Sequence, residues 1–245
     1  MSKFNKNSNG YILTYAIIMT VVFGILLAFV SLVLKPNQDF NRLLEKRDFI
    51  LRAALGEKAL EGIEKQEISE LYEKTVKVEV VNSKGEKMDV DESKISIFKE
   101  YKKPVAEREL PVYIVYNKTD NSKIESYVFP LYGNGLWDNI WGYLAVAGDL
   151  ETVKGVVFDH KGETPGLGAR ITEPAVQARF VGKKIVNASG QIEAPHFQKG
   201  EGNNYDNQPL KVDGMSGATI TGKGVNSMLD SYLELYKPFI EAKKR

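Results

Sequence analysis

One uncharged run near the N-terminus constrains this chain more than any other feature. Residues 11–34 read YILTYAIIMTVVFGILLAFVSLVL and contain no charged side chain. As a helix rising about 1.5 Å per residue, the run spans roughly 36 Å, enough to cross a hydrocarbon core of about 30 Å with some tilt. The sequence therefore predicts a membrane-crossing helix, with the rest of the fold built from the residues after it.

A cleaved signal peptide is the competing interpretation of this run. Its apolar core would cover only about 7–15 residues and end at a small-residue cleavage site. Here the run is longer and is followed by the sequence KPNQ at residues 35–38, which favours a retained anchor. The charges leave the side of the membrane open. More basic residues follow the run than precede it, but long domains translocate largely regardless of such charges.

The remaining composition excludes several classes of protein. The 33 basic and 32 acidic side chains give a formal net charge of +1 and form no basic stripe that would bind nucleic acid. Cysteine is absent, which excludes disulfides, thiolate-held iron–sulfur clusters and cysteine nucleophiles. Electron chemistry would thus depend on an organic cofactor or on histidine and carboxylate ligands. Because His160 and His196 are the only histidines, we expect no metal site.

Periodicity after the anchor predicts one α+β domain, a twisted sheet flanked by helices. Helical patterns cover residues 37–60, 63–72, 173–180 and 221–242. Strand patterns cover residues 74–81, 112–116, 126–131, 144–147, 153–159 and 184–188, with a hairpin turn at 118–121. The charged stretch 87–109 lacks a clear period and is interpreted as an insertion or surface loop. The predicted division is a tail (1–10), a transmembrane helix (11–34), a juxtamembrane helix (35–60) and a soluble domain (61–245).

Three glycine-containing segments carry the candidate chemistry. GNGLWD at residues 133–138 forms either a turn with a buried tryptophan or a bend that lays an aromatic side chain over a flat ligand. HKGETPGLG at 160–168 is either a plain strand-to-helix connection or a loop whose glycines bring the backbone close to a ligand. DGMSGAT at 213–219 precedes a helix, and so forms either an N-cap turn or a phosphate site at the positive end of the helix dipole.

Taken together and in this order behind one membrane helix, the three segments resemble the C subunit of the sodium-translocating NADH:quinone oxidoreductases. The resemblance covers essentially the whole chain and is most specific over residues 131–225. The related G subunit of the Rnf electron-transport complex shares the second and third segments and is the same-class alternative. A membrane-tethered binding domain without flavin is the alternative from another class.

The resemblance implies an FMN-binding domain in which a flavin transferase joins FMN to Thr219 through a phosphoester. It implies no catalytic residue and no metal ligand in this chain. The cofactor-binding residues that it implies are Thr219 as the covalent site, Asp213, Ser216, Gly217 and Ala218 as the pattern that the transferase recognises, Glu163, Thr164, Leu167 and Gly168 as the flavin-lining loop, and Leu136 and Trp137 as ring contacts.

The same resemblance implies a place in a larger enzyme. The chain would be a redox subunit, not catalytic alone, that relays electrons between partner subunits toward quinone. It would cross the bacterial inner membrane once and hold its soluble domain on the periplasmic side. An ion path needs polar or ionisable groups facing a cavity, and one uncharged helix cannot supply it alone. We therefore expect other subunits to move the sodium ion.

Overall fold

The structure is a computed structural model of the chain that describes residues 8–120 and 122–244. Its contacts divide the chain into two units, Met1–Glu45 and Lys46–Arg245, and each is described here by itself. Residues 1–7 of the predicted tail and Asn121 of the predicted hairpin turn lie outside the described residues.

A long helix, α1 (Asn9–Leu55), supplies the described part of the first unit. Among the described residues it is the one helix long and apolar enough to cross a membrane, with a mean hydropathy of 2.9 over its most apolar 18 residues. The side chains of this stretch are exposed, as a lipid-facing surface requires. The helical pattern predicted at 11–34 and the first part of the one predicted at 37–60 form one continuous helix that includes Pro36. This helix ends at Leu55, and residues 57–60 form a 3-10 helix instead.

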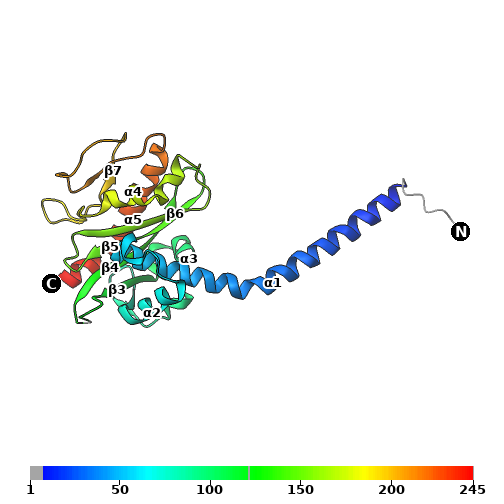
Figure 1. Cartoon of the computed structure of the whole chain (residues 1–245), viewed down its shortest axis with the longest axis horizontal. Helices are drawn as coiled ribbons and strands as arrows, with labels where there is room; N and C mark the ends of the chain where they lie inside the picture. The colour runs from blue at the N-terminus through cyan, green and yellow to red at the C-terminus, as the bar shows by residue number, and fades with distance from the viewer. Residues whose placement is uncertain (1–7, 121, 245) are drawn as a thin grey trace. The chain divides into compact units, whose positions relative to one another are not determined.

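The second unit is built on a six-stranded antiparallel sheet in the order β2-β1-β3-β4-β5-β6. Figure 1 labels four neighbouring strands of this sheet, β3 to β6. The strands are β1 (Val76–Val81), β2 (Lys87–Met88), β3 (Leu110–Tyr116), β4 (Ile124–Asn134), β5 (Asn139–Ala147) and β6 (Val153–His160), with a separate parallel pair β7 (His196–Phe197) and β8 (Lys211–Val212). The further helices are α2 (Lys65–Thr75), α3 (Ile97–Lys102), α4 (Pro174–Gln177) and α5 (Thr219–Lys244), and the short 3-10 helices are η1 (Glu57–Leu60), η2 (Glu92–Lys94), η3 (Val105–Glu107), η4 (Gly168–Thr172) and η5 (Ala178–Phe180). This confirms the predicted fold class.

Alternation along the central strands divides their side chains between two buried clusters. Phe129 and Phe158 belong to the cluster that contains α5, where the Phe129 ring lies 4.7 Å from that of Tyr236. Val128 and Val157 belong to the cluster that contains α2 and the last turns of α1. Strands β4, β5 and β6 are thus buried on both faces, and this packing fixes the position of the turns at their ends.

Two local predictions are wrong. The stretch 87–109 is not one surface loop, because it holds β2, η2, α3 and η3. The many charged residues of this stretch made α3 look like a surface segment in the sequence, although it is packed. Glu100 on α3 is buried, accepts a hydrogen bond from the Glu109 N–H (2.9 Å) and forms an ion pair with Lys103. The stretch 184–188 is not a strand, since only isolated bridges from Lys184 and Val186 occur there.

Candidate functional site

The three predicted segments meet at one end of the sheet. Residues 135–138 close the hairpin between β4 and β5, where Asn134 pairs with Asn139 and the Gly135 N–H donates to the Asp138 carbonyl (2.8 Å). Residues 160–168 leave the end of β6, beside the start of β5. Residues 213–219 lead into α5, whose first residue is Thr219. The sheet and one helix start thus bring together segments that are far apart in the sequence.

A cavity of about 260 Å³ opens where these segments meet. Of the predicted residues it is lined by Leu136, Glu163, Thr164, Leu167, Gly168, Gly217, Ala218 and Thr219, and in addition by Ile220 and Thr221. Trp137 adjoins it, because its indole N–H donates to the Thr164 hydroxyl (3.1 Å). Asp213 and Ser216 do not line it.

The buried carboxylate of Glu163 joins the hairpin turn to the first turn of α5. Its Oε1 accepts from the Trp137 N–H (3.0 Å) and its Oε2 accepts from the Thr221 hydroxyl (2.6 Å). Burial by itself raises the pKa of Glu163, but the hydrogen bonds from Thr221 and from backbone N–H groups of the hairpin turn outweigh it, so the pKa lies below its ordinary value. Glu163 is therefore a charged brace between hairpin and helix.

Glycine is required on both sides of this carboxylate. A Cβ at Gly135 would overlap the Glu163 carboxylate, and a Cβ at Gly168 would overlap both Glu163 and the Thr221 hydroxyl. Gly217 is needed for a different reason, since its φ of +77° lies in the left-handed region that favours glycine. This backbone conformation forms the turn before α5. The close backbone approach that was one interpretation of the 160–168 loop is thus directed at Glu163.

Exposed apolar side chains surround the cavity. Trp137 is 70% exposed, so residues 133–138 form a turn whose tryptophan is not buried. Leu136, Leu167 and Ile220 are also exposed, and all three line the cavity. Large apolar groups gathered on a surface in this way are characteristic of a binding site.

A second cavity, of about 240 Å³, also borders Thr219. Thr219 and Ala218 line both cavities. Lys199 and Lys223 line the second, and within residues 8–120 and 122–244 neither lysine has an ion-pair partner. Thr219 is therefore an exposed residue that lines both an apolar cavity and a cavity with two lysines, at the positive end of a helix dipole.

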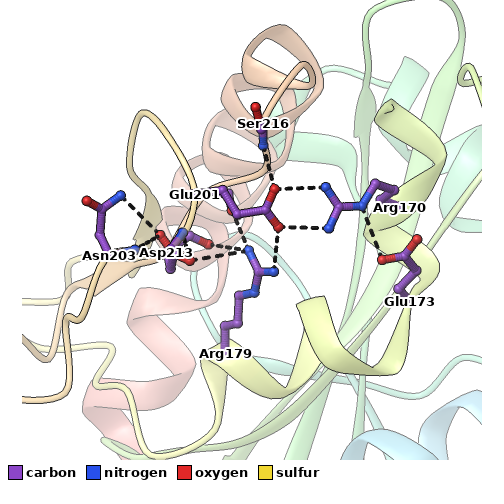
Figure 2. A network of polar contacts seen from close by, with 9 residues as sticks. Arg170, Glu173, Arg179, Glu201, Asn203, Asp213 and Ser216 are labelled. Atoms are coloured by element: carbon purple, nitrogen blue, oxygen red, sulfur yellow. Dashed lines mark hydrogen bonds and ion pairs between the residues drawn. The ribbon is translucent and has the colours of Figure 1, made fainter. Parts of the chain in front are cut away.

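Asp213 and Ser216 face a different set of partners. The Asp213 carboxylate accepts from the N–H groups of Gly202 (2.9 Å) and Asn203 (3.0 Å), and the Ser216 N–H donates to Glu201 (3.0 Å) (Figure 2). Glu201 lies in no sequence motif, and Thr221 lies two residues past the third segment. The partners of both side chains are far away in the sequence, so only the structure reveals these contacts.

Comparison with known proteins places this geometry in a family. Residues 135–234 match the FMN-binding domain. The chain is 32% identical to the C subunit of the Na(+)-translocating NADH-quinone reductase of Haemophilus ducreyi, over 93% of this chain and 90% of that protein. The chain belongs to this C-subunit family. The Pseudomonas aeruginosa C subunit is 32% identical to it over 94% of this chain and 93% of the relative.

The fold of the C-subunit family is also known from crystal structures. That of the Parabacteroides distasonis C subunit superposes with a TM-score of 0.72 at 35% identity, and the match covers 84% of this chain and 96% of that one. The matched FMN-binding domain contains the second and third motif segments and the first from Gly135 onward.

The residues at the site fit FMN. The exposed side chains of Leu136, Leu167 and Ile220 suit one face or edge of a flat, largely apolar ring system. The lysines of the second cavity suit a phosphate. Within the part of the chain that the structure describes, no group of three or more His, Cys, Asp or Glu side chains is placed to hold a metal ion.

Proposed function

We propose that this chain is the electron-transfer subunit of a Na+-translocating NADH-quinone reductase and carries FMN covalently on Thr219. The observation that carries the proposal is that the exposed Thr219 lines both the apolar cavity and the cavity that holds Lys199 and Lys223. Family membership over the whole chain supports the reductase C subunit over the related Rnf G subunit. The exposed apolar groups at the cavity argue against a domain without a ligand.

The attachment is a phosphoester made by a flavin transferase. The Thr219 Oγ–P bond forms as a P–O bond of the donor breaks, and the donor is by chemical class a phosphoric anhydride of FMN. The hydroxyl proton leaves with the displaced phosphate. The exposure of Thr219 lets an enzyme reach Oγ, whereas Thr221 is buried with its hydroxyl donated to Glu163.

Bound FMN supplies one- and two-electron redox chemistry, and the protein holds it in place and tunes its electronics. Leu136, Leu167 and Ile220 exclude water from part of the ring. Lys199 and Lys223 balance the charge of the phosphodiester. The covalent bond keeps the cofactor from dissociating when the domain faces a compartment that supplies no free flavin.

In this proposal the chain acts only within its complex. Its partners are the other subunits, which deliver electrons to the flavin and pass them toward quinone, and the flavin transferase during maturation. Residues 11–34 of α1 cross the bacterial inner membrane once, and the domain after the juxtamembrane segment (35–60) lies on the periplasmic side. The absence of charge in the crossing segment supports ion transport through other subunits.

The full chain co-expressed with a flavin transferase tests the attachment. Denatured wild type should give a fluorescent flavin band on a gel, Thr219→Val none, and Thr219→Ser a band. Thr221→Val should keep the band, though dimmer if the site is loosened. Fluorescence that persists in Thr219→Val would place the bond elsewhere. Purification of the surrounding complex, with or without NADH:quinone activity, separates the role in the reductase from the Rnf alternative.

A further inference from the structure

A carboxylate outside the three motif segments joins the two walls of the apolar cavity. One wall includes Gly168, the first residue of η4, and the other includes Gly217–Thr219. The Glu201 carboxylate accepts two hydrogen bonds from Arg170 of η4 (2.9 and 2.7 Å) and one from the Ser216 N–H (3.0 Å) (Figure 2). The distance between the walls is therefore coupled to one side chain.

The contacts of Glu201 use both oxygens fully. Oε1 accepts from Arg170 and Arg179, and Oε2 accepts from Arg170 and Ser216. Arg170, then Arg179, then the Ser216 N–H hold the pKa of Glu201 far below its ordinary value. Paired, planar hydrogen bonds between a guanidinium and a carboxylate fix direction as well as distance. Glu201 is therefore an ionised, oriented link under ordinary conditions.

Arg179 and Asp213 hold the start of the turn formed by residues 213–216, whereas Glu201 binds its end at Ser216. Arg179 donates to the backbone carbonyls of Asp213 (3.2 Å) and Gly214. The Asp213 carboxylate in turn holds the backbone of Gly202 and Asn203, next to Glu201 in the chain. The turn also packs closely there, because a Cβ at Gly214 would overlap the carbonyl of Gln198. Backbone and side chains thus clamp residues 213–216 onto residues 198–203.

We propose that Glu201 is a positioning residue for flavin attachment. With Arg170 and Arg179 it fixes the turn that presents Thr219 and sets the opening of the apolar cavity. Asp213 acts within this clamp through Gly202 and Asn203, so its place in the attachment pattern reflects turn geometry and not contact with the transferase. The inference rests on the proposed attachment at Thr219.

The decisive variant is Glu201→Gln in the full chain. It removes a charge and an acceptor from the link between the walls. Glu173→Gln is the matched control, because it removes the same charge beside the same Arg170 (3.2 Å to Nε). Among the described residues, the Glu173 carboxylate forms no hydrogen bond or ion pair with the turn or with Arg179. Arg170→Lys is a second variant, which keeps the charge of η4 and loses the paired hydrogen bonds.

The experiment measures the initial rate of flavin attachment against the concentration of detergent-purified apo chain, with a flavin transferase and its flavin donor. Misplacing a reacting group by about 1 Å costs on the order of 100-fold in rate. We expect Glu201→Gln and Arg170→Lys to lower kcat of attachment at least tenfold with little change in KM, and Glu173→Gln to match wild type. Amide exchange at Ser216 should accelerate in Glu201→Gln, which a contact with the transferase would not cause.

Each contrary outcome has a separate meaning. A wild-type rate in Glu201→Gln overturns the proposal. A raised KM with unchanged Ser216 exchange also overturns it, because Glu201 would then be a contact of the transferase. Thr219→Val is measured alongside: if it still acquires flavin, the proposed attachment site fails, whereas its loss of flavin beside a normal Glu201→Gln rate overturns the clamp alone.

Discussion

The Thr221 hydroxyl donates a 2.6 Å hydrogen bond to Glu163 Oε2, and both residues are almost completely buried, at 1% and 4% exposure. Thr221 lies only two residues after Thr219, yet the two hydroxyls face different surroundings. The Thr219 side chain is exposed beside two cavities, whereas that of Thr221 is engaged inside the protein. Within a single helical turn, the exposed threonine that we propose as the attachment site therefore differs from a threonine whose hydroxyl is held inside the protein.

Thr221→Val should destabilise the domain without moving the flavin. Removing one partner of a buried hydrogen bond costs about 1–3 kcal/mol, and more where the group left behind is charged. Thr221→Ser keeps the hydroxyl and should recover most of the loss. Urea unfolding of the full chain, followed by tryptophan fluorescence, measures the difference in free energy.

Thr172→Val is the control for that comparison, since Thr172 is exposed and, among the described residues, its hydroxyl bonds only the Ala169 carbonyl (3.0 Å). A surface substitution of this kind changes stability by about 0.5 kcal/mol or less. Equal effects of Thr172→Val and Thr221→Val would show that the bond to Glu163 contributes nothing.

The stability that Glu163 contributes should depend on pH in a defined direction. Its pKa is lower in the folded chain than in the unfolded one, where it is about 4.3. The contribution is therefore fully present above the unfolded value and is lost as pH falls through the folded value. Glu163→Gln should cost most stability near pH 7, and the difference from wild type should shrink below about pH 4.

Unfolding free energies at pH 7, 5, 4 and 3 check this trend. Glu241→Gln provides the control, because Glu241 is exposed on α5 and has no ion-pair partner among the described residues. Its difference from wild type should stay near zero throughout. A Glu163→Gln difference that grows toward acid pH would reverse the sign and contradict the charged brace.

The sequence predicts the site more completely than it predicts the supports of the site. Glycine spacing and the hydroxyl at residue 219 are local features of the sequence. The three segments could therefore be recognised from the sequence, the second after a strand and the third before a helix. Glu201 could not be found this way. Its partners Arg170 and Arg179 lie 31 and 22 residues away in the chain, and only the folded backbone brings them together.

The fold shows the same contrast. Strands β3 to β6 were predicted because β-branched and aromatic residues are concentrated along them. Helix α3 was missed because it has only six residues and its one buried acidic side chain, Glu100, looks like a surface residue in the sequence. Its burial is compensated by Lys103 and the Glu109 N–H, which no local pattern reveals.

Gly168→Ala should disturb the site far more than Gly162→Ala, although both glycines lie in one loop. A Cβ at Gly168 would lie 2.5 Å from the Thr221 hydroxyl and overlap Glu163, whereas at Gly162 the nearest atom, Asp138 Cβ, is 3.5 Å away. Overpacking of a closed site costs about 1–3 kcal/mol. Gly162→Ala should stay within about 0.5 kcal/mol of wild type.

The same two variants also test whether the brace serves the flavin. Attachment after co-expression with a transferase, read as fluorescence per chain on a denaturing gel, should fall in Gly168→Ala and not in Gly162→Ala. If Gly168→Ala keeps both the stability and the fluorescence of wild type, the close packing around Glu163 has no role in either.

Replacing a lysine of the cationic cavity by glutamate should lower the rate of flavin attachment, and added salt should reduce this effect. Two unit charges 4 Å apart interact by about 1 kcal/mol in water, which corresponds to roughly a fivefold change in rate. Lys199→Glu and Lys223→Glu should each slow attachment by at least that factor at low ionic strength. Salt at about 1 M shortens the screening length to roughly 3 Å and should reduce the deficit.

Lys211→Glu makes the same charge change at an exposed residue of β8 that lines neither cavity. Its attachment rate should therefore remain close to that of wild type at every salt concentration. Because all three variants alter the net charge equally, a general effect of charge on the encounter with the transferase would slow them alike. A deficit confined to Lys199→Glu and Lys223→Glu would instead assign the phosphate side of the flavin to the second cavity.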